Sequence, residues 1–172
     1  LKLDVVGFLT GPMPTQPLGW FKKDIRTAED LRGLKYRTVG LSGDLFTEMG
    51  AAVTAIPGGE IVPSLQRGVI DAAEFNNPSS DRVLGFPDVS KSYVVGSYHQ
   101  RMESFEVLFN KPKYDALAAE QKAILRYAAE AASADMSWKQ QDRYSKDMQE
   151  MKDKQAVKVA KVPDGVLQAQ LN

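Results

Sequence analysis

The feature of this sequence that most constrains its fold is a long stretch without proline or glycine, from Ala118 to about Gln155. Apolar residues recur within it at steps of three and four, which is the period of one face of an α-helix. A continuous helix of roughly 38 residues would be ~57 Å long, whereas a compact globule of this chain length is only ~40 Å across. The helix is too long for one compact body, so we expect it to break, to coil with a partner or to span two domains.

Composition and charge exclude several classes of function. The 172 residues include 22 basic and 22 acidic side chains, so the formal net charge is zero. This balance argues against a nucleic-acid partner, because there is no basic excess to neutralise phosphates. The absence of cysteine removes disulfides, cysteine nucleophiles and thiolate metal sites. No apolar run approaches the ~20 residues of a membrane helix.

The start of the sequence carries an expectation of its own. The run from Leu1 to Val6 reads directly as a strand, and no signal peptide precedes it. We therefore expect the first residue to be a cut edge, either a processed terminus or a truncation.

Strand-like and helix-like segments alternate between residues 34 and 75. We expect strands at 34–39, 52–56 and 69–75, with helices over about 44–49 and 59–67. Gly68 directly after the second helix is a typical helix stop. This alternation predicts βαβ units and an α/β fold with a mainly parallel sheet.

The order of elements changes after Pro78. Beyond it we expect, in chain order, a brief helix at 81–84, strands at 92–98, 104–110 and 157–159, and a final helix at 163–171. The strand at 104–110 contains the run from Phe105 to Phe109, which is apolar enough for the interior of a sheet.

Two charged residues stand at the ends of expected strands. Arg37 precedes the turn at Gly40, and Glu74 precedes the turn-forming Asn77. Ligands in open α/β sheets bind beyond the carboxyl ends of the strands, and the planar fork of arginine matches a carboxylate. The pair suggests a small anionic ligand, with Glu74 in need of a cation. Two plainer readings stay open: Arg37 in a structural ion pair, and Glu74 as an acid at the start of a helix.

Other chemistry-bearing residues are less specific. His99 is the only histidine, so it cannot build a histidine metal cluster, and no Gly-x-Ser-x-Gly nucleophile motif accompanies it. Gly58 and Gly59 could receive an anion on free helix amides, but a tight turn explains them equally well. Tryptophans such as Trp20 are more often packing residues than ligand platforms.

A longer segment resembles a known family. Thr27 to Arg37 contains a Leu-x-Gly-Leu-Lys-x-Arg pattern that is similar to a signature of tripartite ATP-independent periplasmic (TRAP) transporter substrate-binding proteins. The segments 56–61, 65–74 and 108–111 follow in the family's order. The sequence resembles the DctP-like family, and within it the branch that binds 2-oxo acids and other monocarboxylates.

The resemblance covers the C-terminal half of such proteins and implies a division of the chain. It implies a periplasmic-binding-protein-like lobe with a mixed, mainly parallel sheet plus a long domain-spanning helix. The expected parts are a hinge and strand from a missing N-terminal lobe (1–14), the ligand-binding lobe (15–102), a returning strand and turn (103–117), the spanning helix (118–155) and a C-terminal strand and helix (156–172).

The resemblance also assigns site residues. It implies Arg37 as the carboxylate clamp, with Gln16, Phe75 and Trp20 as further substrate contacts. The metal ligands that it implies are Gln16, Glu74, the main-chain carbonyl of Phe75 and Gln100. Such oxygen ligands favour sodium or calcium. Two departures bear on the site, since Gln100 stands where the branch can have a carboxylate and Phe75 replaces a common tryptophan.

The function implied is that of a periplasmic solute-binding component, not an enzyme. The expected ligand is a small carboxylate, such as the 2-oxo acid pyruvate or a 2-hydroxy acid, held by the arginine and a bridging metal ion. The expected partners are the membrane permease subunits and, through the long helix, a homodimer or swapped oligomer. Alternatives left open are a dicarboxylate or sugar acid bound without metal, a metal-dependent enzyme using Glu74 and His99 on oxo acids, and a helical oligomerising module.

Overall fold

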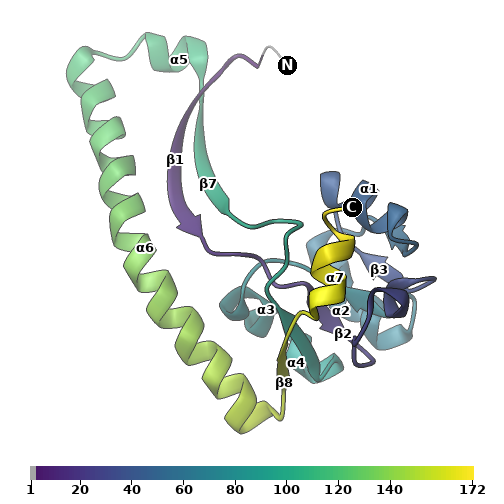
Figure 1. Ribbon diagram of the computed structural model, residues 1–172. Coiled ribbons are helices and arrows are strands. Elements are labelled where there is room, and N and C mark those ends of the chain that lie inside the picture. Colours follow the sequence, from purple (N-terminus) through teal and green to yellow (C-terminus); the bar gives the residue numbers. More distant parts are fainter. Residues whose placement is uncertain (1–2) are drawn as a thin grey trace. The chain divides into compact units, whose positions relative to one another are not determined.

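The computed structural model describes residues 3–172, and it divides the chain into two compact units (Figure 1). The larger unit is formed by Thr15–Arg101 and Arg143–Asn172, and the smaller by the N-terminal residues to Pro14 together with Met102–Asp142. The helix α6 (Ala119–Gln155) is continuous and contributes residues to both units. The long helix expected from the sequence is therefore confirmed.

A six-stranded sheet forms the centre of the larger unit, in the order β4-β3-β5-β2-β6-β8. Its strands are β2 (Gly19–Phe21), β3 (Lys35–Arg37), β4 (Ala52–Thr54), β5 (Ala72–Ala73), β6 (Ser92–Val95) and β8 (Lys158–Lys161). β3 pairs in parallel with β4 and β5, and β6 pairs in parallel with β8, whereas β2 is antiparallel to both of its neighbours. The expected α/β fold with a mixed, mainly parallel sheet is confirmed.

Helices connect the parallel strands as the alternation predicted. α1 (Leu41–Glu48) joins β3 to β4, and α2 (Gly58–Arg67) joins β4 to β5. Gly68 ends α2 in the left-handed conformation, with φ of 75°, which glycine adopts at little cost. The other helical segments of this unit are η1 (Ala28–Leu31), α3 (Pro78–Leu84), α4 (Phe86–Val89) and α7 (Asp164–Ala169).

β5 is much shorter than the strand expected at 69–75. After Ala73 the Glu74 amide still donates to the Arg37 carbonyl at 3.2 Å. The chain then turns, because the Asn77 side chain accepts the amides of Ser79 and Ser80 and so begins α3. Because α3 begins so soon, β5 ends at Ala73, directly before Glu74.

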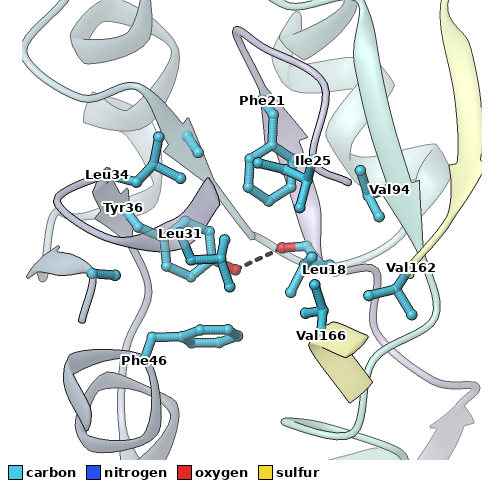
Figure 2. Close-up of a cluster of buried hydrophobic side chains, with 12 residues drawn as sticks. Leu18, Phe21, Ile25, Leu31, Leu34, Tyr36, Phe46, Val94, Val162 and Val166 are labelled. Atoms are coloured by element: carbon cyan, nitrogen blue, oxygen red, sulfur yellow. Dashed lines mark hydrogen bonds between the residues drawn. The ribbon is translucent and has the colours of Figure 1, made fainter. Parts of the chain in front are cut away.

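Two clusters of buried apolar side chains stabilise this unit. Figure 2 shows the first, which includes Leu18, Phe21, Leu31, Tyr36, Phe46, Val94, Val162 and Val166. Within it the Tyr36 hydroxyl donates to the Leu18 carbonyl at 2.6 Å, drawn as a dashed line in Figure 2. The second cluster includes Trp20, Ile61, Leu65, Ile70, Phe86, Tyr93 and Met151. The sheet is thus buried against helices and loops, as its apolar strands require.

Residue 19 has to be glycine for β2 to pair with β5. Gly19 has a φ of +127°, and a Cβ atom there would lie 2.3 Å from the Ala73 carbonyl oxygen. No side chain fits in that space. The close approach brings the segment before β2, which contains Gln16, beside the end of β5.

The smaller unit is built on a two-stranded antiparallel ribbon. Among residues 3–172, β1 (Val5–Met13) pairs with β7 (Glu103–Asn110) and with no other strand, and β7 is followed by α5 (Lys111–Asp115). The expectation that the strand at 104–110 lies in a sheet interior was wrong. Phe105, Val107 and Leu108 are exposed, because no further described strand pairs with β7 and no second layer covers their side chains.

The two ends of α6 differ in burial. In the smaller unit Ile124, Tyr127 and Trp138 are exposed, the last at 78%. In the larger unit Met151 is buried and Asp147 bonds Arg82 of α3 at 2.7 Å. Along residues 3–172, no helix combines the length and the apolar character that a membrane crossing needs.

Candidate functional site

The candidate site begins where β3 and β5 end side by side. The two strands are parallel, with Tyr36 opposite Ala72 and Arg37 opposite Ala73. Their carboxyl ends therefore meet at the same edge of the sheet, which is where α/β folds place ligands. Arg37 and Glu74 come together there, with Nη1 of Arg37 3.1 Å from Oε1 of Glu74.

Arg37 is held from two sides and is only 5% exposed. Its Nε donates to the Ile56 carbonyl at 2.9 Å, and its Nη1 donates to both the carbonyl and the carboxylate of Glu74. Within residues 3–172, no hydrogen bond is made by its Nη2. The ion-pair reading of Arg37 therefore describes the structure, and it still leaves the Nη2 hydrogens for a ligand oxygen.

Gln16 joins the same cluster from the segment before β2. Its side chain is 1% exposed, and its Nε2 donates to the Phe75 carbonyl at 2.8 Å and to Oε2 of Glu74. Its Oε1 is buried and meets no donor among the described residues. Its backbone amide donates to the Gln100 carbonyl at 3.0 Å. The Gln16 side chain thus contacts the Glu74 carboxylate and the Phe75 main-chain carbonyl, and the Gln16 main chain contacts the Gln100 main chain.

The donor set at Gln16 fits a hard cation. The Glu74 carboxylate and the Phe75 carbonyl both face one amide group, and a half-turn about the Cγ–Cδ bond would exchange its Nε2 and Oε1. Three oxygens would then face one another and would need a cation between them. No group of three or more His, Cys, Asp or Glu that could hold a metal occurs in the described chain. One carboxylate with neutral oxygens suits sodium or calcium better than zinc.

The Phe75 ring lies near the arginine. The Arg37 Cζ atom is 5.9 Å from the ring centroid, and the ring stacks on Phe86 at 6.3 Å. A Cβ atom at Gly58 would lie 2.7 Å from the ring. The glycine at the start of α2 therefore leaves space for the Phe75 ring.

Trp20 lies apart from this cluster, in the core. It is 0% exposed, its ring stacks on Tyr93 at 4.2 Å, and its Nε1 donates to Oδ2 of Asp81 at 2.9 Å. Its role as a substrate contact stays a prediction. The packing explains why a tryptophan suits this position of β2.

His99 is half-buried and lies against the core residue Phe46. Burial lowers its pKa to about 4, its Nδ1 lies 2.6 Å from the Ser97 hydroxyl, and its ring meets Phe46 edge-on at 5.4 Å. No hydrogen bond joins it to Glu74 in the part of the chain that the structure describes. The geometry gives no acid–base pair of the kind that the enzyme alternative needs.

Sequence reasoning missed the roles of Ile56 and Asp81, and it interpreted Gly58 as an anion site or a tight turn rather than as room for the Phe75 ring. Ile56 acts through its carbonyl, which no side-chain pattern reveals. Asp81 is 1% exposed, and burial raises its pKa to about 7. An acid in the first turn of a helix after Asn77-Pro78 is ordinary in sequence, so only its burial marks it as unusual.

Comparisons with known proteins identify the family of this chain. Residues 15–170 match the family described as bacterial extracellular solute-binding protein, family 7. A monocarboxylate 2-oxoacid-binding periplasmic protein of Nostoc sp. is 36% identical over 135 residues, which cover 78% of this chain and 37% of that protein. The chain therefore belongs to the family 7 extracellular solute-binding proteins.

Solved structures of TRAP solute-binding proteins have the same fold. One from Bordetella bronchiseptica, a dimer with copurified calcium and picolinate, has a TM-score of 0.91 at 29% identity, covering 99% of this chain and 50% of that one. One from Pseudoalteromonas atlantica with bound sodium and pyruvate has a TM-score of 0.87 at 31% identity, covering 98% and 51%. The chain spans about half the length of these relatives.

Proposed function

We propose that this chain is part of the periplasmic solute-binding component of a TRAP transporter that binds a small 2-oxo or 2-hydroxy monocarboxylate such as pyruvate. The single observation that carries the proposal is that Arg37 and the side-chain amide of Gln16 both donate to the Glu74 carboxylate, with the Phe75 carbonyl bound by the same amide. Relatives of this family bind such acids, and the Nostoc protein is named for them.

Each group has a separate part in binding. Arg37 supplies Nη2 hydrogens to the ligand carboxylate, and its contacts with Ile56 and Glu74 keep the guanidinium in place before the ligand arrives. Gln16, Glu74 and the Phe75 carbonyl would hold a sodium or calcium ion. Such a cation supplies a positive charge to the ligand carboxylate and to an oxygen on the adjacent carbon. An acid without that second oxygen completes fewer contacts, which is the proposed basis of selectivity.

A second candidate is a dicarboxylate or sugar acid bound without metal. It is favoured by the direct Arg37–Glu74 ion pair, which already neutralises the one carboxylate of the cluster. In that case selectivity would come from hydrogen bonds to further hydroxyl or carboxyl groups. Cation dependence separates the two candidates.

The partners follow from the proposed class. The permease subunits of the transporter would receive the ligand at the membrane. A second copy of this chain would contact the exposed apolar residues of α6, for which the dimeric relative from Bordetella bronchiseptica is the support.

Calorimetric titration of the full-length protein with pyruvate tests the proposal. Arg37→Ala should weaken binding about 100-fold, because a buried charge-assisted contact is lost. Arg37→Lys keeps the charge without the fork and should retain part of the affinity. Arg26→Ala is the matched control, since the Arg26 side chain is exposed and pairs with the exposed Asp24. Equal affinity of the parent and the Arg37→Ala variant would refute the clamp.

The cation is tested in the same titration. In chelated, sodium-free buffer pyruvate affinity should fall at least tenfold and return on addition of calcium or sodium, while acetate should bind weakly throughout. Affinity that is independent of both cations would favour the metal-free candidate.

A further inference from the structure

A buried carboxyl group of the larger unit has no part in the site described above. Asp81 stands in α3 and is 1% exposed. Its Oδ2 accepts the Trp20 indole N–H at 2.9 Å, and its Oδ1 accepts the Asn76 backbone N–H at 3.2 Å. Each oxygen therefore binds a donor from a different segment of the chain.

Those two segments are the ones that carry the candidate ligand groups. Trp20 lies four residues after Gln16, and Asn76 directly follows Glu74 and Phe75. Gln16 meets Phe75 through its side chain. Asp81 joins the same two segments a second time, through Trp20 and Asn76.

The buried Trp20 ring is held in place by two other aromatic rings. Its ring stacks on Tyr93 at 4.2 Å and on Phe86 at 5.7 Å. The Trp20 indole is therefore a rigid partner for Asp81. The second bond of Asp81, to the Asn76 amide, fixes the main chain immediately after the Phe75 carbonyl. The direction of that carbonyl depends on the peptide plane that it shares with the Asn76 amide.

A buried carboxyl group is a poor way to stabilise a core. Burial and the nearby Glu74 raise the pKa of Asp81 to about 7, against the bonds from Trp20 and Asn76, which lower it. The Tyr93 phenol beside it also has its pKa raised well above its usual value, by burial and by Asp81. Because the Asp81 carboxyl group is hard to ionise in this environment, its presence is better explained by the segments that it orients than by a contribution to the stability of the core.

We propose that Asp81 is a positioning residue for the ligand site, which holds the Gln16 segment and the Glu74–Asn76 segment in register by accepting the Trp20 indole and the Asn76 amide. The inference rests on the proposed function, because the site that it positions is the proposed binding site. Asp81 itself touches neither ligand nor cation. It acts by keeping the Phe75 carbonyl and Glu74 aimed at Gln16.

Four variants of the full-length protein test this role. Asp81→Asn leaves one acceptor oxygen for two donors and places an NH2 group against one of them. Trp20→Phe removes one donor, and in the double variant the remaining oxygen can accept the Asn76 amide without a second donor facing the new NH2 group. Asp88→Asn is the control, since Asp88 is an exposed aspartate of the neighbouring α4. The measurements are pyruvate affinity in calcium buffer and hydrogen exchange of residues 74–77 without ligand.

We expect Asp81→Asn to weaken pyruvate binding at least tenfold and to speed exchange in 74–77, with Asp88→Asn unchanged. The double variant should bind more tightly than Asp81→Asn alone, which a merely structural role would not produce. If Asp81→Asn binds pyruvate like Asp88→Asn and exchanges at the same rate, the inference is overturned. If it does not fold, Trp20→Phe carries the test, with a two- to fivefold loss expected and unchanged affinity and exchange overturning the idea.

Failure of the proposed function gives a different result. If the parent protein binds no pyruvate, the proposed function is refuted. The hydrogen-exchange measurement can still be made, because it needs no ligand. Faster exchange of residues 74–77 in Asp81→Asn would then still support the positioning role, and unchanged exchange would overturn it.

Discussion

The two units of this chain bury the apolar residues of their strands to different degrees. In the larger unit both residues of β5 and all of β2 are buried. In the smaller unit β7 mixes polar and apolar residues, and its apolar residues Phe105, Val107 and Leu108 are exposed. The difference lies in what surrounds each strand, because β5 has strands on both sides whereas β7 pairs with β1 alone among the strands that the structure describes. Apolar content alone therefore does not show how deeply a strand is buried.

The largest effect on stability is expected from a substitution that breaks the pairing of β2 with β5 in the larger unit. Gly19→Ala places a Cβ atom 2.3 Å from the Ala73 carbonyl oxygen at a positive φ. We expect a loss of about 5 kcal/mol in the free energy of unfolding, or failure to fold. The matched control is Gly59→Ala, where nothing lies within 4 Å, and which should be neutral or slightly stabilising because the site is helical. Urea denaturation measures both, and similar stability of the two variants would contradict the pairing.

The second effect comes from the buried acid of the larger unit. The folded-state pKa of Asp81 is about 7, above its ordinary value of 3.8. The folded form keeps this proton up to about pH 7, whereas the unfolded form releases it near pH 4. Stability from this group is therefore present below pH 4 and is lost as the pH rises to about 7, by up to about 4 kcal/mol.

Denaturation midpoints between pH 4 and 8 measure that dependence. Asp81→Asn should flatten the profile over this range, while Asp88→Asn should keep it. A parent profile without a decline towards pH 7, or one that Asp81→Asn leaves intact, would show that Asp81 is not the group responsible.

A third test compares one phenylalanine from each unit. Phe86 is 0% exposed in the second core cluster, and Phe105 on β7 is 41% exposed. Phe86→Ala should cost about 4 kcal/mol, and Phe105→Ala about 1 kcal/mol. Equal losses would mean that β7 is buried in solution by something that contacts the ribbon. This pair of variants thus measures how far the two units really differ.

The smallest effect on stability is expected on the exposed part of α6. Trp138→Glu should change the free energy of unfolding by less than about 0.5 kcal/mol, as a surface substitution does. If a second copy covers this side chain, the same change should shift the molar mass in light scattering from dimer towards monomer. Glu130→Gln is a control on the same helix, since Glu130 is exposed and pairs locally with Arg126. A parent that is monomeric at all concentrations would remove the dimer proposal.

Part of the candidate site could be predicted because it is local in sequence. Arg37 and Glu74 stand at strand ends, and parallel pairing of β3 with β5 was implied by the alternation of strands and helices. Gln16, Phe75 and Gln100 came from the family resemblance alone, since their polar atoms are an amide and main-chain carbonyls that many positions offer. Asp81 could not be predicted, because its importance depends on burial.

Periodicity, helix breakers and caps act over a few residues, so the amino-acid sequence is enough to predict the α/β class, the long helix and the helix stop at Gly68. The pairing of Arg37 with Glu74, the contacts of Gln16 with Glu74 and Phe75, and the bonds of Asp81 with Trp20 and Asn76 depend on the folded chain. These contacts join residues far apart in the chain, so they exist only once the strands are paired. Burial then sets the strength of each charge and hydrogen bond, and burial is a property of the folded chain.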